Sequence, residues 1–486
     1  MSETLTKAKL DQYRKDVVRF AEEQFYLPDT GKPIKLLKHQ KKILRLAFTP
    51  VRGRMPYSTI VYSCPKKSGK TTIGALVALW WSLAMEPFNE IILCANDEEQ
   101  AIGRTFQMIT RAIKLNPHLG PVVTRSTVEY PETDTKIEAI ASEYAGAAGA
   151  NPGLTVWDEL WAYTHESSRR LYEELTPSPT RKNSVRLIVT YAGFEGESLL
   201  LKELYDRGMK GERIDDELPI YVNGGLFMYW DHRPRMPWQT PEYYEDQRAA
   251  LRPSSFARMH RNQWVSSEST FIEPEWFDAC VDPELRPMLA GKGDPIFVGV
   301  DAATKRDSLA VAGVYYDRDK GKVVLAFHRI WEPKPGEPLD LEETVENYLL
   351  EQAERFRIKE TIFDPYQMAR SASTMKKAGI RMREFPQTVP NLTLMGDNLF
   401  ALIKNGNLMT YSAPEIRLAL SRAVAIESSR GWRIAKEKQS HKIDIVVALG
   451  MASLAAVQRG SKPKREAFCA SFSREGGMLG RTAVGG

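Results

Sequence analysis

Residues 58–74, STIVYSCPKKSGKTTIG, constrain the fold more than any other stretch of the chain. An apolar, β-branched run at 59–62 leads into a short loop, and SGKTT at 68–72 leads into an apolar sequence of helical character. A strand, a tight loop and a helix in this order form the setting of a phosphate-binding P-loop, where loop N–H groups and the helix N-terminus surround phosphate oxygens. We therefore expect an α/β fold organised around this loop.

The residues of this loop have separate predicted tasks. Lys70 would reach the β- and γ-phosphates of a nucleotide, and the Thr71 hydroxyl would bind Mg²⁺. Cys64 stands where the usual motif has its first glycine. The motif alone is therefore equally compatible with an ordinary strand–turn–helix unit that carries a solvated lysine. The predicted nucleotide-binding residues of the loop are Lys66, Lys67, Ser68, Gly69, Lys70, Thr71 and Thr72.

Further apolar runs alternate with helical segments after the loop. They lie at 90–95, 136–141, 154–157 and 184–190, and they predict a parallel sheet covered by helices on both faces. The run at 154–157 ends in Asp158-Glu159, the form of a Walker B strand. Asp158 would hold Mg²⁺ opposite Thr71, and Glu159 would activate the attacking water. Together with the loop, this pair predicts an ATPase with Lys70 and Glu159 as catalytic residues.

Two residues at the margins of this region are weaker candidates. Gln40 precedes the P-loop strand, where a glutamine could recognise adenine, but an exposed glutamine on a helix is the alternative. Thr190 ends the strand at 184–190, where its hydroxyl could sense the γ-phosphate, but a threonine at a strand end needs no such role. Both stay candidates for nucleotide binding.

Three aspartates dominate the second half of the chain. Asp301 and Asp364 each end an apolar strand, and Asp444 opens the apolar helix expected at 443–457. Carboxylates from two adjacent strands and one helix can hold two Mg²⁺ or Mn²⁺ ions for phosphodiester cleavage, the arrangement of an RNase H-like nuclease with a mixed sheet. Asp307 is a candidate for an additional ligand. Each aspartate alone could instead cap a loop or a helix.

Length and composition allow this two-part plan. A chain of 486 residues accommodates about two to four domains. Four cysteines without a C-x-x-C pair indicate neither a zinc site nor a disulfide framework. A polar N-terminus and the lack of a long apolar run predict a protein that is neither secreted nor membrane-bound. The expected division is an ATPase domain at 1–265 that includes a lid or linker subdomain at 195–265, a linker at 266–295, a nuclease domain at 296–460, and a basic, disordered tail at 461–486. Within the nuclease domain, helices are expected at 391–404 and 413–428 and a hairpin at 429–440.

A P-loop ATPase followed by an RNase H-like nuclease resembles the large terminase subunit of tailed double-stranded DNA bacteriophages. The resemblance runs in order through Gln40, Cys64 to Thr72, Leu154 to Glu159, Thr190, Asp301, Asp364 and Asp444, and covers nearly the whole chain. It implies a motor that cuts concatemeric viral DNA and uses ATP to pump it through the portal into a procapsid. It also implies a ring, a pentamer, docked on the portal in the host cytoplasm, with a small terminase subunit that selects the DNA.

One departure and two alternatives accompany this resemblance. The family often has a basic residue shortly before the Walker B strand, proposed as an arginine finger, but residues 145–150 contain none. Arg104 and Arg125 are substitutes, although each can equally be solvated. A helicase-nuclease of DNA repair would need a second RecA-like domain, which the sequence does not repeat. A structural capsid or portal protein with a relic P-loop would not need two complete sets of acidic residues.

Overall fold

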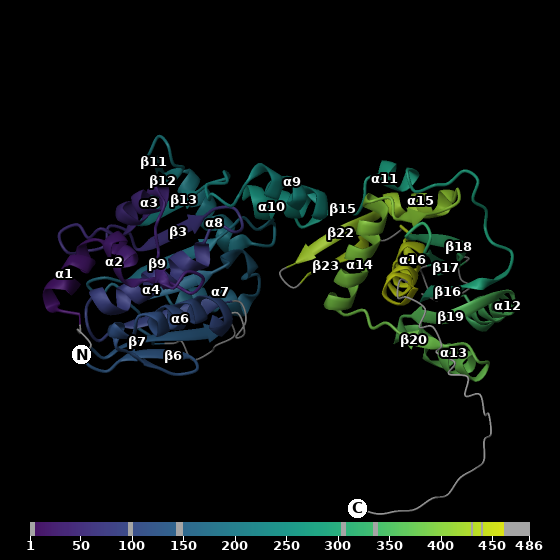
Figure 1. The fold of residues 1–486 in the computed structure, drawn as a ribbon, viewed down its shortest axis with the longest axis horizontal. Helices are drawn as coiled ribbons and strands as arrows, with labels where there is room; N and C mark the ends of the chain where they lie inside the picture. Colours follow the sequence, from purple (N-terminus) through teal and green to yellow (C-terminus); the bar gives the residue numbers. More distant parts are fainter. Residues whose placement is uncertain are drawn as a thin grey trace, which may run out of the picture. The chain divides into compact units, whose positions relative to one another are not determined.

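The computed structural model describes residues 5–95, 101–141, 149–302, 308–333, 339–428, 431–438 and 441–460. The chain forms two compact units, which we call the first and the second unit (Figure 1). The first comprises Met1–Phe271 with Val424–Ala435, and the second comprises Ile272–Ala423 with Lys436–Gly486. The domain limits expected from the sequence stay predictions, and the tail at 461–486 lies outside the described residues.

The first unit is built on a ten-stranded sheet with the order β11-β12-β13-β3-β9-β8-β4-β7-β6-β5. Its six central strands, from β13 to β7, are parallel, and antiparallel strands extend both edges. The predicted α/β fold with a parallel sheet is therefore confirmed. The strands are β3 (Thr59–Ser63), β4 (Glu90–Ala95), β5 (Val122–Val123), β6 (Thr127–Tyr130), β7 (Thr135–Ala141), β8 (Leu154–Asp158), β9 (Val185–Thr190), β11 (Glu212–Arg213), β12 (Ile220–Asn223) and β13 (Leu226–Trp230).

Part of the region expected to be a lid belongs to this sheet. β13 pairs in parallel with β3, and all five of its residues are buried. β12 joins β13 through the two-residue turn Gly224-Gly225, where Gly224 adopts a φ of 57°. A continuous apolar strand such as β13 is stable when both of its faces are covered, which explains its place beside β3. The part of the expected lid that follows β13 contains the helices α9 (Pro241–Ala250) and α10 (Pro253–Arg261).

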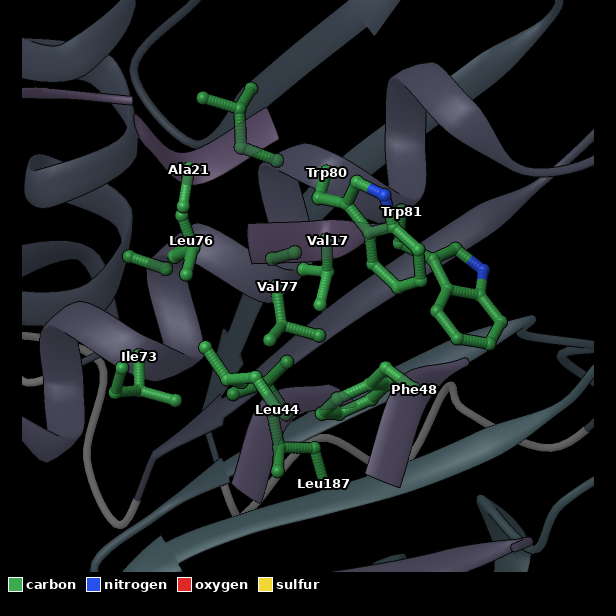
Figure 2. Packing of buried hydrophobic residues seen from close by; sticks show 14 of the residues in the cluster. Val17, Ala21, Leu44, Phe48, Ile73, Leu76, Val77, Trp80, Trp81 and Leu187 are labelled. Atoms are coloured by element: carbon green, nitrogen blue, oxygen red, sulfur yellow. The ribbon is translucent and has the colours of Figure 1, made fainter. Parts of the chain in front are cut away.

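The core of the first unit lies around α4 (Lys70–Ala84), which starts at the P-loop and is buried on nearly all sides. Trp80 and Trp81 on this helix pack with residues of α2 (Val17–Gln24) and α3 (Lys38–Phe48), as Figure 2 shows. The helix expected over 4–26 is two helices, α1 (Lys7–Lys15) and α2, separated by Asp16, whose side chain accepts a hydrogen bond from Val18 N. The other helices of this unit are α6 (Gln107–Leu115), α7 (Glu166–Glu174) and α8 (Leu199–Met209).

The second unit holds a six-stranded mixed sheet with the order β20-β19-β16-β17-β18-β21. β16, β17 and β18 are antiparallel, whereas β19 and β20 continue the sheet in parallel from β16. This topology confirms the expected RNase H-like mixed sheet. The strands are β16 (Gly291–Ala302), β17 (Leu309–Asp317), β18 (Lys322–Trp331), β19 (Phe356–Phe363), β20 (Met382–Glu384) and β21 (Leu408–Met409). The helices are α11 (Pro274–Asp278), α12 (Asn347–Arg355), α13 (Pro365–Lys377), α14 (Val389–Lys404), α15 (Pro414–Ser421) and α16 (Asp444–Ala455).

The chain departs from the sequence-based expectation between 413 and 440. The predicted helix at 413–428 ends early, because α15 stops at Ser421 and β22 (Ala423–Ser428) follows it. The hairpin expected at 429–440 consists instead of β22 and β23 (Gly431–Lys436). Burial alternates along β22, which is the period of a strand with one covered face. This strand pairs with β15 (Glu268–Thr270) of the first unit. Within the part of the chain that the structure describes, no helix is long and apolar enough to cross a membrane.

Candidate active sites

The P-loop lies between β3 and α4, as the sequence predicts. Gly69 adopts a φ of 74°, the left-handed conformation that glycine tolerates, at the residue before α4 begins. Lys70 is 6% exposed, and its Nζ donates hydrogen bonds to the carbonyl oxygens of Cys64 at 3.0 Å and Pro65 at 3.1 Å. A buried cation bonded to neutral carbonyls is costly unless an anion approaches it. The loop therefore fits a phosphate group.

The predicted metal ligands Thr71 and Asp158 meet at the C-terminal end of β8. Asp158 Oδ2 accepts hydrogen bonds from the hydroxyl of Thr71 at 3.3 Å and from that of Thr105 at 3.2 Å. Asp158 Oδ1 is buried and has no hydrogen-bond partner among the described residues. An orphaned carboxylate oxygen beside a threonine hydroxyl is a suitable pair of hard ligands for Mg²⁺. The residues present therefore fit the predicted metal.

Glu159 follows β8 in a left-handed conformation with a φ of 56°. Its Oε2 accepts a hydrogen bond from Trp161 Nε1 at 2.7 Å. Burial raises the pKa of Glu159 to about 7, although Lys70 counteracts this rise. A carboxylate with a pKa near neutrality can accept a proton in one step and release it in the next. The structure thus gives Glu159 the properties expected of a residue that activates water.

The segment after β13 holds the P-loop from outside. Gln239 Nε2 donates to the carbonyl of Lys66 at 3.0 Å and to Ser68 Oγ at 3.1 Å, and Trp238 Nε1 donates to the carbonyl of Lys67 at 2.8 Å. From α10, the carbonyl of Met259 accepts the N–H of Lys66 at 2.7 Å. Several elements therefore fix the loop backbone.

The other loop residues surround this centre in different ways. Lys66 is partly buried, and burial together with the neighbouring charge of Lys67 lowers its pKa. Lys67 is exposed and adopts a φ of 67°. Thr72 lies in the first turn of α4 and is partly buried. Their predicted contacts with nucleotide remain predictions.

The structure places Gln40 and Thr190 in the interior. Gln40 is only 4% exposed, so the alternative of an exposed helix glutamine is wrong. Its Oε1 accepts the N–H of Leu37 at 3.0 Å, at the start of α3. Thr190 is fully buried at the end of β9, and its hydroxyl donates to the carbonyl of Tyr191 at 3.0 Å. Neither contact tests the adenine-binding or phosphate-sensing role, and both roles stay predictions.

The two arginines proposed as substitutes for an arginine finger are both exposed. Arg104 lies on the π-helical segment Ala101–Phe106, and its charge lowers the pKa of Asp158, against a larger rise caused by burial. Arg125 lies between β5 and β6. Most of the stretch at 145–150 lies outside the described residues. Both arginines therefore stay candidates.

The three aspartates of the predicted nuclease lie at neighbouring element ends. Val300 of β16 pairs with Phe363 of β19 in parallel register, so Asp301 and Asp364 come next at the same edge of the sheet. Asp444 begins α16, which packs against β16. The contact is close, because a Cβ at Gly299 would lie 1.9 Å from the carbonyl oxygen of Ala448. The fold therefore brings the three backbones together as the sequence predicts.

The side chains of two of these aspartates have other partners in this conformation. Asp364 Oδ1 accepts the N–H of Tyr366 at 3.1 Å and so caps α13, and Ser308 Oγ donates to Asp444 Oδ2. Within the described ranges, no group of three or more His, Cys, Asp or Glu residues is placed to hold a metal ion. Asp307, the candidate additional ligand, lies outside those ranges. Two-metal binding therefore stays a prediction for this site.

Several residues at the sites have no signal in the sequence. Thr105 and Ser308 contact predicted aspartates through single hydroxyls, and isolated hydroxyl residues occur everywhere along the chain. Trp161 stands two residues after Glu159, so its nearness was available from the sequence, but the direction of its indole was not. Gln239 and Met259 reach the P-loop from the far part of the first unit, and only the tertiary fold shows this.

Comparison with known proteins gives a family for this domain. Residues 38–207 match the family model described as terminase large subunit, ATPase domain. This domain is a terminase large-subunit ATPase domain. The match contains the P-loop, β8 with Asp158 and Glu159, and Thr190, so the residues discussed above lie within it. No curated protein matches the sequence.

Solved structures of terminases share the fold. The large terminase from a thermophilic bacteriophage aligns with a TM-score of 0.58 at 12% identity, covering 86% of this chain and 98% of that chain. The same terminase in complex with ATP-gamma-S aligns with a TM-score of 0.53 at 14% identity, covering 86% and 100%. The magnesium-bound large terminase nuclease of thermophilic phage G20c aligns with a TM-score of 0.31 at 17% identity, covering 38% and 96%. The first two alignments extend over both units of this chain and establish a shared fold.

Proposed function

We propose how the residues of this phage DNA-packaging motor share its two activities, ATP hydrolysis and DNA cleavage. The observation that carries the ATPase half is the meeting of Thr71 and Asp158, with Glu159 next to Asp158 and buried Lys70 at the start of α4. This is the set of groups that phosphoryl transfer from a nucleotide requires, because that reaction depends on positioning and charge neutralisation.

The ATP step assigns one task to each of these residues. Lys70 leaves its loop carbonyls to contact the β- and γ-phosphates, while the N–H groups at the start of α4 face the phosphate oxygens. Glu159 accepts a proton from the attacking water, for which a pKa near 7 is suitable. Gln40 and Thr190 contribute to binding and sensing of the nucleotide.

Thr71 and Asp158 would hold Mg²⁺ in this site, with Asp158 Oδ1 as the free oxygen. When bound, the ion would supply neutralisation of the phosphate charge. Thr105 keeps the carboxylate of Asp158 oriented by occupying its other oxygen. An ATP analogue is bound by the full-length phage terminase that shares this fold, which supports a nucleotide at this site.

The second unit cleaves DNA in this proposal. Asp301, Asp364 and Asp444 would hold two Mg²⁺ or Mn²⁺ ions, which would activate water and stabilise the leaving oxygen. Carboxylate oxygens are hard ligands, which suit either ion. The side chains of Asp364 and Asp444 need only rotate away from their present partners, because the backbone of β16, β19 and α16 already places them at one edge.

The partners follow from packaging. The substrate is double-stranded DNA, held through its phosphates because a motor must pass over any sequence. The chain works as a ring of copies, a pentamer, docked on the portal of the procapsid in the host cytoplasm, and a small terminase subunit delivers the DNA.

The proposal is tested by ATP hydrolysis with and without double-stranded DNA, in the presence and absence of Mg²⁺. We expect Mg²⁺-dependent turnover that DNA stimulates and that Asp158→Asn abolishes. As a matched control, Asp134→Asn changes a carboxylate in an exposed turn before β7 and should leave turnover unchanged. Turnover that survives in Asp158→Asn would contradict the assigned metal site.

A further inference from the structure

Arg258 of α10 is a buried cation beside the ATPase centre. Its side chain is 6% exposed, and its guanidinium carbon lies 4.2 Å from the ring centroid of Trp161, 4.4 Å from that of Phe194 and 5.2 Å from that of Tyr191. We call these three rings the aromatic cage. Nε and Nη1 of Arg258 have no hydrogen-bond partner among the described residues. The cage therefore holds the guanidinium by its flat face.

Burial of a cation in this way is expensive. A desolvated charge without an ion pair costs several kcal/mol, and a cation–π contact returns about 2 kcal/mol when it is desolvated. A leucine or methionine would fill the same space at lower cost. The arginine is therefore unlike an ordinary packing residue, and its position next to the site suggests what it does.

One member of the cage touches the predicted catalytic glutamate. Trp161 Nε1 donates its hydrogen bond to Glu159 Oε2 at 2.7 Å, while the ring of the same indole lies under Arg258. An indole that is clamped on its face cannot rotate without breaking that hydrogen bond. Arg258, Trp161 and Glu159 thus form a continuous chain of contacts from α10 to the carboxylate.

The helix that carries Arg258 is itself tied to the P-loop strand. The next residue, Met259, accepts the N–H of Lys66 through its carbonyl. Asn262, at the end of α10, is fully buried and links Ser63 Oγ at 3.1 Å with the N–H of Ala192 at 2.7 Å. These contacts give α10 one position relative to the loop, so the cage is a defined reference for Glu159.

We propose that Arg258 is a positioning residue of the ATPase centre, which clamps the indole of Trp161 and so fixes the carboxylate of Glu159 for its reaction with water. The inference rests on the proposed ATP hydrolysis. It adds a residue outside the loop and the Walker B strand, and it makes the geometry of Glu159 depend on α10. A shift of α10 would then change the rate of hydrolysis without changing the groups that bind nucleotide.

Steady-state ATP hydrolysis by the full chain separates positioning from binding. Arg258→Met fills much of the same space but removes the planar charge, and we expect kcat to fall about tenfold or more while KM for ATP stays within about threefold. Arg258→Lys should also lose activity, because an ammonium group does not clamp a ring face as a guanidinium does. Arg261→Met, an exposed position on the same helix, is the matched control and should retain wild-type values.

A pair of further variants tests the chain of contacts. Trp161→Phe retains an aromatic ring but removes the N–H, and it should reduce kcat by a similar factor. The double variant with Arg258→Met should show little additional loss, because both changes break one pathway. Independent, multiplying losses would overturn the proposal, as would a kcat of Arg258→Met equal to that of the control at unchanged thermal stability.

A second measurement does not depend on turnover. Amide hydrogen exchange across residues 158–163 reports how firmly Glu159 and Trp161 are held. Arg258→Met should accelerate exchange in this segment, whereas Arg261→Met should not. Unchanged exchange would reject the clamp whether or not the wild-type chain hydrolyses ATP, and a wild-type chain without hydrolysis but with the expected exchange would reject only the proposed function.

Discussion

Arg252 Nη2 lies 2.9 Å from Glu427 Oε1, and the two side chains are 8% and 7% exposed. Ser254 Oγ and Ser255 Oγ each donate to Glu427 Oε1 at 3.0 Å, so this oxygen is fully occupied. The guanidinium also lies 3.8 Å from the ring centroid of Trp432 on β23. Because Arg252 immediately precedes α10, this buried pair joins the hairpin of β22 and β23 to the helix that carries Arg258.

Breaking this pair on one side should be costly. Arg252→Ala leaves Glu427 buried without its cation, and we expect the first unit to lose about 3–5 kcal/mol in its free energy of unfolding. Chemical unfolding of the full chain, followed for the first unit by its tryptophans, measures this loss. The double variant Arg252→Met with Glu427→Leu removes both charges and should recover most of the stability. A double variant as unstable as the single one would show that the pair stabilises for a reason other than charge burial.

The contact of β16 with α16 predicts a second stability effect. Gly299→Ala adds a methyl group within 1.9 Å of the carbonyl oxygen of Ala448, and backbone on both sides prevents relief of the overlap. We expect the second unit to unfold at a markedly lower denaturant concentration, with loss of several kcal/mol. Gly293→Ala, on the same strand with open space at its Cβ, is the control. Equal midpoints for the two variants would contradict the close packing of α16 on the sheet.

The N-terminal helices predict a pH dependence of stability. Burial raises the pKa of Glu23, but hydrogen bonds from Lys9, Arg19 and Tyr13 outweigh it and lower the pKa to about 2, from an ordinary value of 4.5. A carboxyl whose folded pKa is lowered stabilises the fold above its unfolded pKa and loses this contribution as pH falls toward the folded value. The stability of the first unit should therefore fall between about pH 4.5 and 2, and by less in Glu23→Gln. The same slope in both proteins would exclude Glu23 as a source of the pH dependence.

The second unit is tested by cleavage of plasmid DNA. We expect the wild-type chain to cut with Mn²⁺ or Mg²⁺, and Asp364→Ala to lose cutting by at least about a hundredfold because one proposed metal ligand is removed. Asp397→Ala, on α14, is the control carboxylate of the same unit. A well-folded wild-type chain that does not cut with either ion would remove the nuclease from the proposal. Cutting that survives in Asp364→Ala would instead assign the metals to other residues.

The sequence predicted those parts of the molecule that short-range patterns determine. The β-branched run at 59–62, the glycine before Lys70 and the apolar strand before Asp158 each indicate their structure within a few residues, and the structure agrees. The same reasoning placed Asp301 and Asp364 at neighbouring strand ends, because parallel strands share one edge.

Tertiary contacts set the remainder. The segment 423–428 looks helical beside α15, yet it is a strand because β15 offers an edge and Arg252 offers a partner for Glu427. Gln40 carries no mark in the sequence of being buried rather than exposed. Arg258 reaches the ATPase centre from a stretch with no motif, since its role depends on three rings from other elements. Long-range packing of this kind cannot be obtained from a local pattern.

The most direct measurement of the central claim compares ATP binding and ATP turnover in the wild type and in Glu159→Gln. The substitution keeps the size of the side chain but removes the base, so MgATP should bind with nearly unchanged Kd while kcat falls by about a hundredfold or more. That result would place water activation at Glu159, next to the Asp158 that meets Thr71. Turnover that continues at the wild-type rate in Glu159→Gln would contradict the account of this ATPase centre.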